Sequence, residues 1–275
     1  MATIVANGAR TAPKKNNPSW FSRQTRKRFP GFVSLIALIA IWQLAIVVFN
    51  PSDIILPGPS AVWHAFVDAV EDGSVSEAVA GSAGPLAIGM AFALFAIPIG
   101  LAIGMSPVAD LITSPHLWAF FALPNVAFAP LLILMTGLSE TTRILMVVLS
   151  ASVPLCLSCK DGVQTVDAGL VRAARSFGGG RFSVFYKVIA PCSLPFIASG
   201  VRNAISRGFV GLISVELLIG TRGSIGGEVR DSLRTFDTAR GFAFILLLIG
   251  IALSLVSASR YFEVVASRWR EEVVL

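Results

Sequence analysis

The sequence predicts an all-α polytopic membrane protein with about six transmembrane helices. Of its 275 residues, 55% are hydrophobic and only 14% are charged, and the mean hydropathy is +0.76. These values are not those of an ordinary soluble domain. From Gly31 to Thr142 there is no lysine or arginine. A soluble protein would need charged side chains to cover so much surface, so the chain is expected to be a membrane protein.

Six hydrophobic runs are candidate spans, because a bilayer core of about 30 Å needs roughly 20 helical residues. They are residues 32–49, 85–105, 117–137, 144–158, 194–220 and 241–259. The fourth run is short. Five spans are the alternative if the third and fourth runs form a re-entrant pair.

The distribution of basic residues predicts the orientation, because lysine and arginine are enriched in cytoplasmic flanks. The first 30 residues contain seven and form a basic segment, whereas residues 50–84 contain none but carry five acidic side chains. We therefore expect the N-terminus, residues 167–191 and the C-terminus to be cytoplasmic, and residues 50–84 to be external. Residues 221–240 are an exception, because this expected external loop carries four arginines.

Two short helices are expected in the external loop 50–84. Residues 61–70 place Val62, Phe66, Val67 and Val70 on one face of a helix. Ser74 and Glu77 have the spacing of a capping box that would begin a second helix. Such helices either roof the bundle where a solute arrives or merely cap the spans.

The segment 171–191 is a polar, glycine-centred helix–turn–helix between two hydrophobic runs. The spacing of four apolar residues predicts a helix with one narrow apolar stripe, with Asp167 as its N-cap. The stripe is Leu170, Ala173, Ala174 and Phe177, and the polar face carries Arg172, Arg175 and Ser176. Three glycines beginning at Gly178 are expected to end this helix. A second short helix is expected to end at Pro191, just before the next span.

These residues resemble the EAA loop of bacterial ABC importer permeases, whose pattern is Glu-Ala-Ala, three residues, Gly, nine residues and Ile-x-Leu-Pro. The matching residues are Ala173, Ala174, Gly178, Val188 (for Ile) and Pro191, and the departures are Arg172 for Glu and Ala190 for Leu. Residues 56–62, 123–131 and 215–218 further resemble the nitrate/sulfonate/taurine branch. A basic amphipathic helix lying on lipid is the alternative reading of the loop.

The resemblance implies the type I ABC importer permease fold in residues 31–275, following a cytoplasmic segment 1–30, in the bacterial inner membrane. It implies that the loop 167–191 couples to a separate ATPase through Arg172, Ala173, Ala174, Arg175, Ser176, Phe177, Gly178 and Pro191. The implied partners are an ABC ATP-binding subunit, which holds ATP and Mg, a solute-binding protein and a second permease copy, as a homodimer in lipid. The branch implies a small anion as substrate, such as a sulfonate, nitrate or organic acid.

Polar residues within the spans are candidates for the translocation path or gate, since a charge buried in hydrocarbon needs a partner or water. The candidates are Asn125, Arg207 and Glu216. The last two are nine residues apart and project to nearly opposite faces of one helix, so they cannot pair with each other. Either they line a wet pathway that favours anions, or they form structural ion pairs across the bundle or the dimer interface.

Signatures of other functions were not found in the sequence. There is no G-x-x-x-x-G-K-[ST] motif, so we expect a non-catalytic subunit that does not itself bind ATP. Cys156 and Cys159 have redox spacing but no thioredoxin-like context, and the two histidines lie far apart. The basic residues are mostly juxtamembrane, so no nucleic-acid partner is expected. A secondary transporter or channel-like protein without an ATPase is the alternative function, although no internal repeat supports it.

Overall fold

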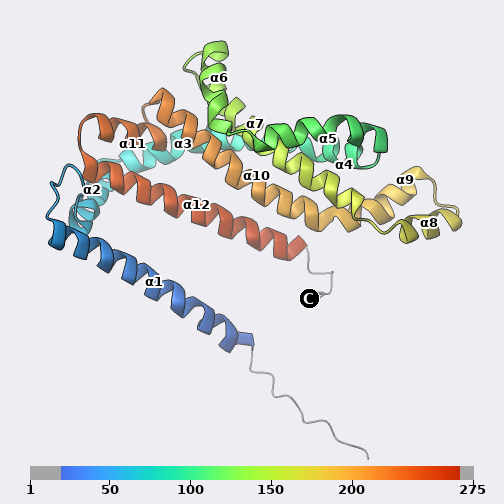
Figure 1. The fold of residues 1–275 in the computed structure, drawn as a ribbon, viewed down its shortest axis with the longest axis horizontal. Coiled ribbons are helices and arrows are strands. Elements are labelled where there is room, and N and C mark those ends of the chain that lie inside the picture. Colours follow the sequence, from blue (N-terminus) through green and yellow to red (C-terminus); the bar gives the residue numbers. More distant parts are fainter. Residues whose placement is uncertain (1–19, 267–275) are drawn as a thin grey trace, which may run out of the picture. The chain divides into compact units, whose positions relative to one another are not determined.

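The structure is a computed structural model that describes residues 20–266, and the side chains of Ser34 and of residues 36–260. The described residues form helices and no strand (Figure 1). The prediction of an all-α fold is therefore confirmed. The first 19 residues of the expected basic segment and the C-terminal tail from residue 267 lie outside the described residues.

The chain divides into two compact units, residues 1–51 and 52–275. The first unit contains α1 (Trp20–Phe49), of which Ile36–Phe49 is a short apolar helix. α1 runs unbroken across residues 30 and 31, where the sequence analysis divides the basic segment from the membrane domain. That division stays a prediction.

Four described helical segments are long and apolar enough to cross a membrane, all in the second unit. They are Ser74–Gly104 (α3, Ser74–Ala93, and α4, Ala96–Gly104), Glu140–Gln164 (α7), Arg181–Ile219 (ending in α10, Ala190–Ile219), and Thr238–Arg260 within α12 (Thr238–Ala266). A bent helix pair raises the number to five. The apolar part of α1, Ile36–Phe49, is shorter than a span, so a sixth span stays a prediction.

The third expected span, residues 117–137, is not one straight helix, and this part of the prediction is wrong. It is divided among α5 (Pro107–Ala122), η1 (Asn125–Phe128) and α6 (Ala129–Thr136), with a bend of 94°. Pro124 disfavours the helical conformation at the residue before it. Leu123 is accordingly extended, with φ −71° and ψ 140°. The 94° bend thus falls within the third run, and a second break at residues 137–139 separates α6 from α7.

The expected capping box at Ser74 is also wrong, because Gly73, which has no side chain to accept a hydrogen bond, occupies the N-cap position. α3 begins at Ser74 and continues into the second span as far as the break at Leu94 and Phe95. Pro98 explains the break, since it has no N–H to donate to the carbonyl of Leu94. The other outer helix is found as α2 (Pro59–Glu71).

The core of the second unit lies where α4 and α10 pack on α7. Ala151, Leu155 and Cys159 of α7 are fully buried there, against small residues of the neighbouring helices. Small residues on one side of α10 let its backbone approach α7 closely, as is common between membrane helices. They are Gly200, Ala204, Gly208 and Gly211.

The two ends of the second unit carry different segments (Figure 1). At one end, α2 lies beside α12 and α3, and α11 (Ile225–Arg234) packs on α12 and α3. Thr238 donates a hydrogen bond of 2.9 Å to the carbonyl of Asp53 at this end. At the opposite end lie α8 (Ala168–Ser176) and α9 (Arg181–Val184). The segments expected outside therefore share one end, and the glycine-centred loop lies at the other.

Candidate functional site

Helix α8 forms where the sequence predicts it, with Asp167 as its N-cap. The Asp167 carboxylate accepts a hydrogen bond of 2.6 Å from the backbone N–H of Gly169. No residue of α8 is buried by the rest of the described chain. At the two ends of the apolar stripe, Leu170 is 52% exposed and Phe177 is 93% exposed. Apart from its contacts with α9 and η2, the stripe is thus open at both ends to another protein or lipid.

The C-terminus of α8 is a Schellman motif built on two glycines. Gly178 has a left-handed φ of +80°, and its N–H donates to the carbonyl of Arg175 at 2.9 Å. The N–H of Gly179 donates to the carbonyl of Ala174 at 3.0 Å. A Cβ at Gly178 would touch nothing within 4 Å, whereas one at Gly179 would lie 2.6 Å from the Ala174 oxygen. Gly178 is therefore required for its conformation and Gly179 for close packing.

Pro191 does not end the second helix of the loop, which corrects the sequence prediction. α9 continues through one π-helical turn, η2 (Phe185–Ile189), directly into α10. The N–H of Ala190 donates to the carbonyl of Phe185, five residues earlier. The wider turn accommodates Pro191, whose missing N–H and bulky ring would disrupt a regular α-turn. α9, η2 and α10 thus form one continuous helical segment of 39 residues, Arg181–Ile219.

Glu216 lies in a fully buried polar cluster at the end of the unit opposite α8. Its side chain is 0% exposed and accepts hydrogen bonds from the Ser82 hydroxyl at 3.0 Å and from the Gly226 N–H at 3.1 Å. Arg143 of α7 is 3.5 Å from one carboxylate oxygen. The Ser82 hydroxyl also accepts from the N–H of Ile225 at 3.0 Å. One carboxylate therefore joins α3, α7, α10 and the start of α11.

Arg207 is placed very differently from Glu216. It is exposed on α10, and its guanidinium lies 5.0 Å from the centre of the Phe121 ring, within range of a cation–π contact. Asn125 of η1 lines the same small hollow as Arg207, together with Ser150 of α7. No carboxylate of the described residues pairs with Arg207. The structure therefore brings together two of the three path candidates and separates the third.

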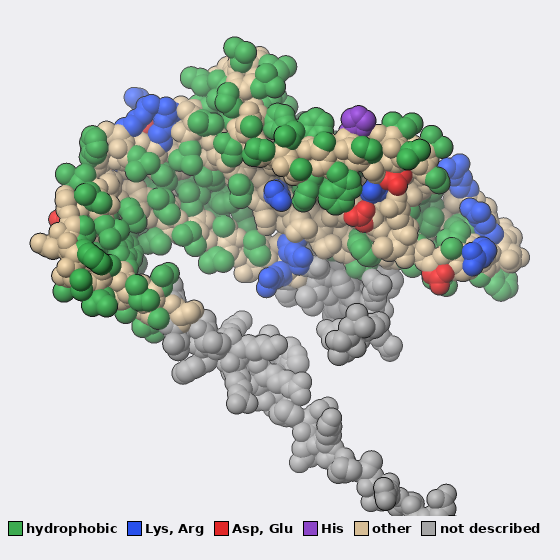
Figure 2. All heavy atoms as spheres, in the orientation of Figure 1, with side chains coloured by type: hydrophobic (Ala, Val, Ile, Leu, Met, Phe, Trp, Pro, Cys, Tyr) green, Lys and Arg blue, Asp and Glu red, His purple; other side chains and the backbone are tan. Residues whose placement is uncertain are grey.

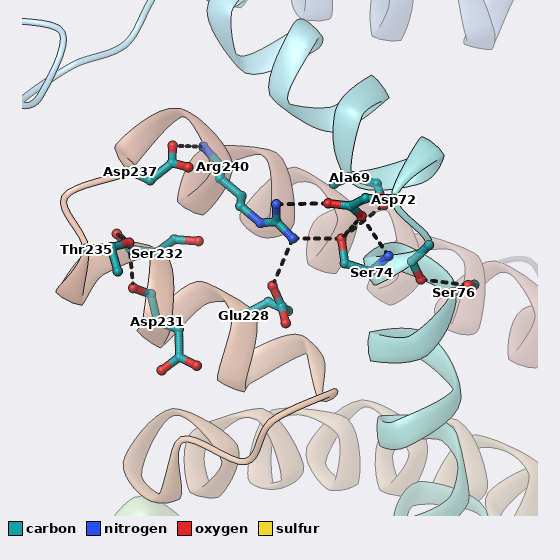
Figure 3. A network of polar contacts seen from close by, with 11 residues as sticks. Ala69, Asp72, Ser74, Ser76, Glu228, Asp231, Ser232, Thr235, Asp237 and Arg240 are labelled. Atoms are coloured by element: carbon teal, nitrogen blue, oxygen red, sulfur yellow. Dashed lines mark hydrogen bonds and ion pairs between the residues drawn. The ribbon is translucent and has the colours of Figure 1, made fainter.

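The arginine-rich loop 221–240 is partly neutralised by a second polar cluster (Figure 3). Arg240 donates to Asp72 at 3.1 Å, to the Ser74 hydroxyl at 2.8 Å and to Glu228 at 3.4 Å. Hydrogen bonds from the hydroxyl and the backbone N–H of Ser74, and then that from Arg240, lower the pKa of Asp72 below its ordinary value. This ion pairing explains how one arginine is accommodated in a loop expected outside.

Sequence reasoning did not identify two basic residues that the structure pairs in the bundle, Arg143 and Lys160. Lys160 is 5% exposed and lies 3.1 Å from Asp110 and 2.9 Å from the Ser114 hydroxyl, which joins α7 to α5. The sequence does contain a signal that could have identified them: each basic residue lies at an end of the hydrophobic run 144–158 and so needs a partner. Which carboxylate each one meets depends on helix packing and could not be predicted.

No group of three or more His, Cys, Asp or Glu side chains that could hold a metal occurs within residues whose side chains the structure describes. Cys156 and Cys159 are both buried in α7. The arrangement instead combines an exposed helix at one end, a small hollow lined in part by Arg207 and Asn125, and a buried polar cluster at the other end. Together with the long apolar helices, these features are those of a polytopic membrane protein.

The family model described as "Binding-protein-dependent transport system inner membrane component" matches residues 96–271. The chain belongs to this family, so it is a non-catalytic, multi-pass permease subunit of an ABC transporter. It is similar to the taurine transport system permease protein TauC of Escherichia coli (strain K12), at 28% identity over 94% of this chain and 98% of that protein. It is also similar to the putative aliphatic sulfonates transport permease protein SsuC of Bacillus subtilis (strain 168), at 28% identity over 97% of this chain and 98% of that protein.

A solved structure supports the fold. A chain in the crystal structure of an amino acid ABC transporter with histidines superposes with a TM-score of 0.58, at 17% identity, and covers 74% of this chain and 97% of that chain. The resemblance stated from the EAA-like residues is thus confirmed at the level of the family. Family membership also implies an ATPase and a solute-binding protein as partners.

Proposed function

We propose that this permease imports a small organic or inorganic anion, such as a sulfonate, as a homodimer in the bacterial inner membrane. The loop 167–191 would dock on the ATP-binding subunit, which holds ATP and Mg. The observation that carries this proposal is α8: a capped helix whose apolar stripe is exposed at both ends, and which a glycine turn links to the continuous helix of α9, η2 and α10. Movement of the ATPase would pass along this continuous helix to the spans, as rigid-body motion.

The proposal that the substrate is an anion rests on Arg207 and Asn125. An arginine at the middle of a span is costly in lipid, by at least about 2.5 kcal/mol, so its exposed face needs water or protein. A second permease copy facing α10 would enclose a polar path lined by Arg207 and Asn125. Two similar permeases are named for the transport of taurine and of aliphatic sulfonates, which supports an anionic substrate. Glu216 is assigned a structural role here, because its carboxylate is already saturated by partners.

Reconstitution tests the transport proposal. The permease and the ATPase that co-purifies with it are placed in proteoliposomes with internal ATP and Mg, and uptake of taurine, an alkanesulfonate and nitrate is measured with the cognate binding protein outside. We expect uptake of at least one anion that depends on ATP. Uptake that proceeds without the ATPase would instead support the secondary-transporter alternative.

Substitution at Gly178 tests the coupling loop. Gly178→Val forces a β-branched residue into a left-handed φ and should abolish ATPase association while leaving membrane insertion intact. Gly180→Val is the matched control, since Gly180 has φ −70° and open space around its Cβ position. Equal ATPase binding by wild type and both variants would contradict the coupling role.

Cysteine labelling tests the expected topology. Gly180→Cys is the better site than Gly179, where a side chain would collide with the Ala174 carbonyl. In a background with Cys192 replaced by serine, an impermeant thiol reagent should label Gly180→Cys in inverted vesicles and not in intact cells. Labelling from outside would place the loop and the termini on the other side.

A further inference from the structure

The loop 167–191 carries positive charge that the described chain does not neutralise. Arg175 and Arg181 line one hollow of about 390 Å³, together with Met105, Gly179, Val184 and Ile189. No acidic residue lines this hollow, and neither arginine forms an ion pair with any described residue. Figure 2 shows basic side chains gathered at this end of the second unit.

Other basic side chains of the second unit form ion pairs within the chain. Arg143 lies beside Glu216, and Arg240 beside Asp72 and Glu228. A guanidinium binds a carboxylate or phosphate through paired N–H donors, so two arginines around one hollow form a ready site for an anionic group. The described residues therefore supply no negative charge to this hollow.

We propose that the hollow between Arg175 and Arg181 receives an acidic side chain, Asp or Glu, of the ATP-binding subunit. This inference rests on the proposed docking of the loop and specifies its chemistry. A protein carboxylate is favoured over a lipid phosphate because large aromatic side chains close to the two arginines in the sequence stand exposed. Phe177 is 93% exposed and Phe182 is 81% exposed. Aromatic anchors beside arginines are typical of protein interfaces.

The position of the hollow supports the same partner. α8 and α9 form the end of the second unit, away from the middle of the spans (Figure 1). Arg172, also exposed on α8, adds a third positive charge where the EAA pattern has glutamate. The ATPase surface that meets this loop is therefore acidic, with room for apolar contact at Phe177 and Phe182.

Charge reversal tests the proposal. Binding of the co-purifying ATPase to the permease in nanodiscs is titrated for wild type, Arg175→Glu, Arg181→Glu and Lys187→Glu. The first two should weaken binding by at least about tenfold, and the wild-type affinity should fall as salt rises. Lys187→Glu is the matched control, because Lys187 is exposed on the same loop but does not line the hollow. It should change the affinity by less than about threefold.

Each alternative result has a defined meaning. Arg175→Gln and Arg181→Gln, measured beside the glutamate variants with thermal unfolding of each, separate loss of charge from loss of folding. If Gly178→Val abolishes ATPase binding but neither arginine variant weakens it, the docking stands and the acidic partner is refuted. If ATPase binding requires the arginines only in nanodiscs containing phosphatidylglycerol, and not in pure phosphatidylcholine, the hollow takes a lipid phosphate and the proposal is overturned. If Gly178→Val also binds normally, the docking itself fails.

Discussion

Glu216 and Arg207 are charged residues nine positions apart on one membrane helix, yet their surroundings are opposite. Glu216 is fully buried and has partners on three other elements. Arg207 is exposed and contacts the face of an aromatic ring. The difference teaches that a charge in a span is not by itself a sign of a pathway. What distinguishes the two is whether the chain supplies the opposite charge.

The packing around α10 produces this difference. Its side near Glu216 meets α3, α7 and the first turn of α11, so polar groups converge there from several directions. Around Arg207 the described residues offer the bent region at Phe121 and Asn125, and Ser150 with apolar side chains of α7. The first site therefore holds the bundle together, and the second is open to a ligand or to another subunit.

The largest effect is expected from Glu216→Leu. It leaves the largely buried Arg143 guanidinium without its carboxylate, and Ser82 and the Gly226 N–H without their acceptor. Stability should fall by about 3–5 kcal/mol, measured by thermal unfolding of the purified permease. The double variant Arg143→Met/Glu216→Leu should lose less than Glu216→Leu alone. A double variant whose loss equals the sum of the losses of Glu216→Leu and Arg143→Met would show that the two charges are not coupled.

Arg207→Gln should instead leave folding intact and reduce uptake by about tenfold or more, as expected for the loss of a charge-assisted contact to an anion. Uptake in proteoliposomes and thermal unfolding are compared side by side. Arg207→Lys keeps the charge and should retain more uptake than Arg207→Gln. A loss of stability as large as that of Glu216→Leu would break the comparison, because Arg207 would then be a structural residue.

Gly226→Ala sharpens the comparison without changing a charge. A Cβ at Gly226 would lie 2.5 Å from the Glu216 Cβ and 3.1 Å from the Leu217 nitrogen, so α11 must shift away from α10. We expect a loss of about 1–3 kcal/mol in thermal unfolding. The matched control is Gly84→Ala, where nothing lies within 4 Å of the new Cβ. Equal stability of the two variants would mean that the contact at Gly226 is loose.

The smallest effect is expected at the exposed cluster of Asp72, Ser74 and Arg240. Because its hydrogen bonds lower the pKa of Asp72, this carboxylate stabilises the folded protein above its ordinary pKa near 4, and the contribution disappears as the pH falls through the lowered value. Ser74→Ala removes the main cause and should make unfolding less dependent on pH below about 4. An unchanged acid profile would show that these contacts do not persist in solution.

Much of the architecture was predictable from particular residues. The unbroken hydrophobic runs predict helices in lipid, and the spacing of Leu170, Ala173, Ala174 and Phe177 with Asp167 before them predicts α8. Gly178 predicts its left-handed end, since side chains disfavour that conformation. These features are local: each depends on residues within a few turns of one another.

The remainder was decided by tertiary structure. Pro124 is visible in the sequence, but whether a proline bends a span by 94° or is absorbed, as Pro154 is within α7, depends on the helices packed around it. The sequence by itself determined that α10 carries charges with no partner on their own helix. Only the packing of α3, α7 and α11 decided that Glu216 is locked in place while Arg207 stays accessible, because pairing across a bundle depends on helix rotation and approach, which no local pattern encodes.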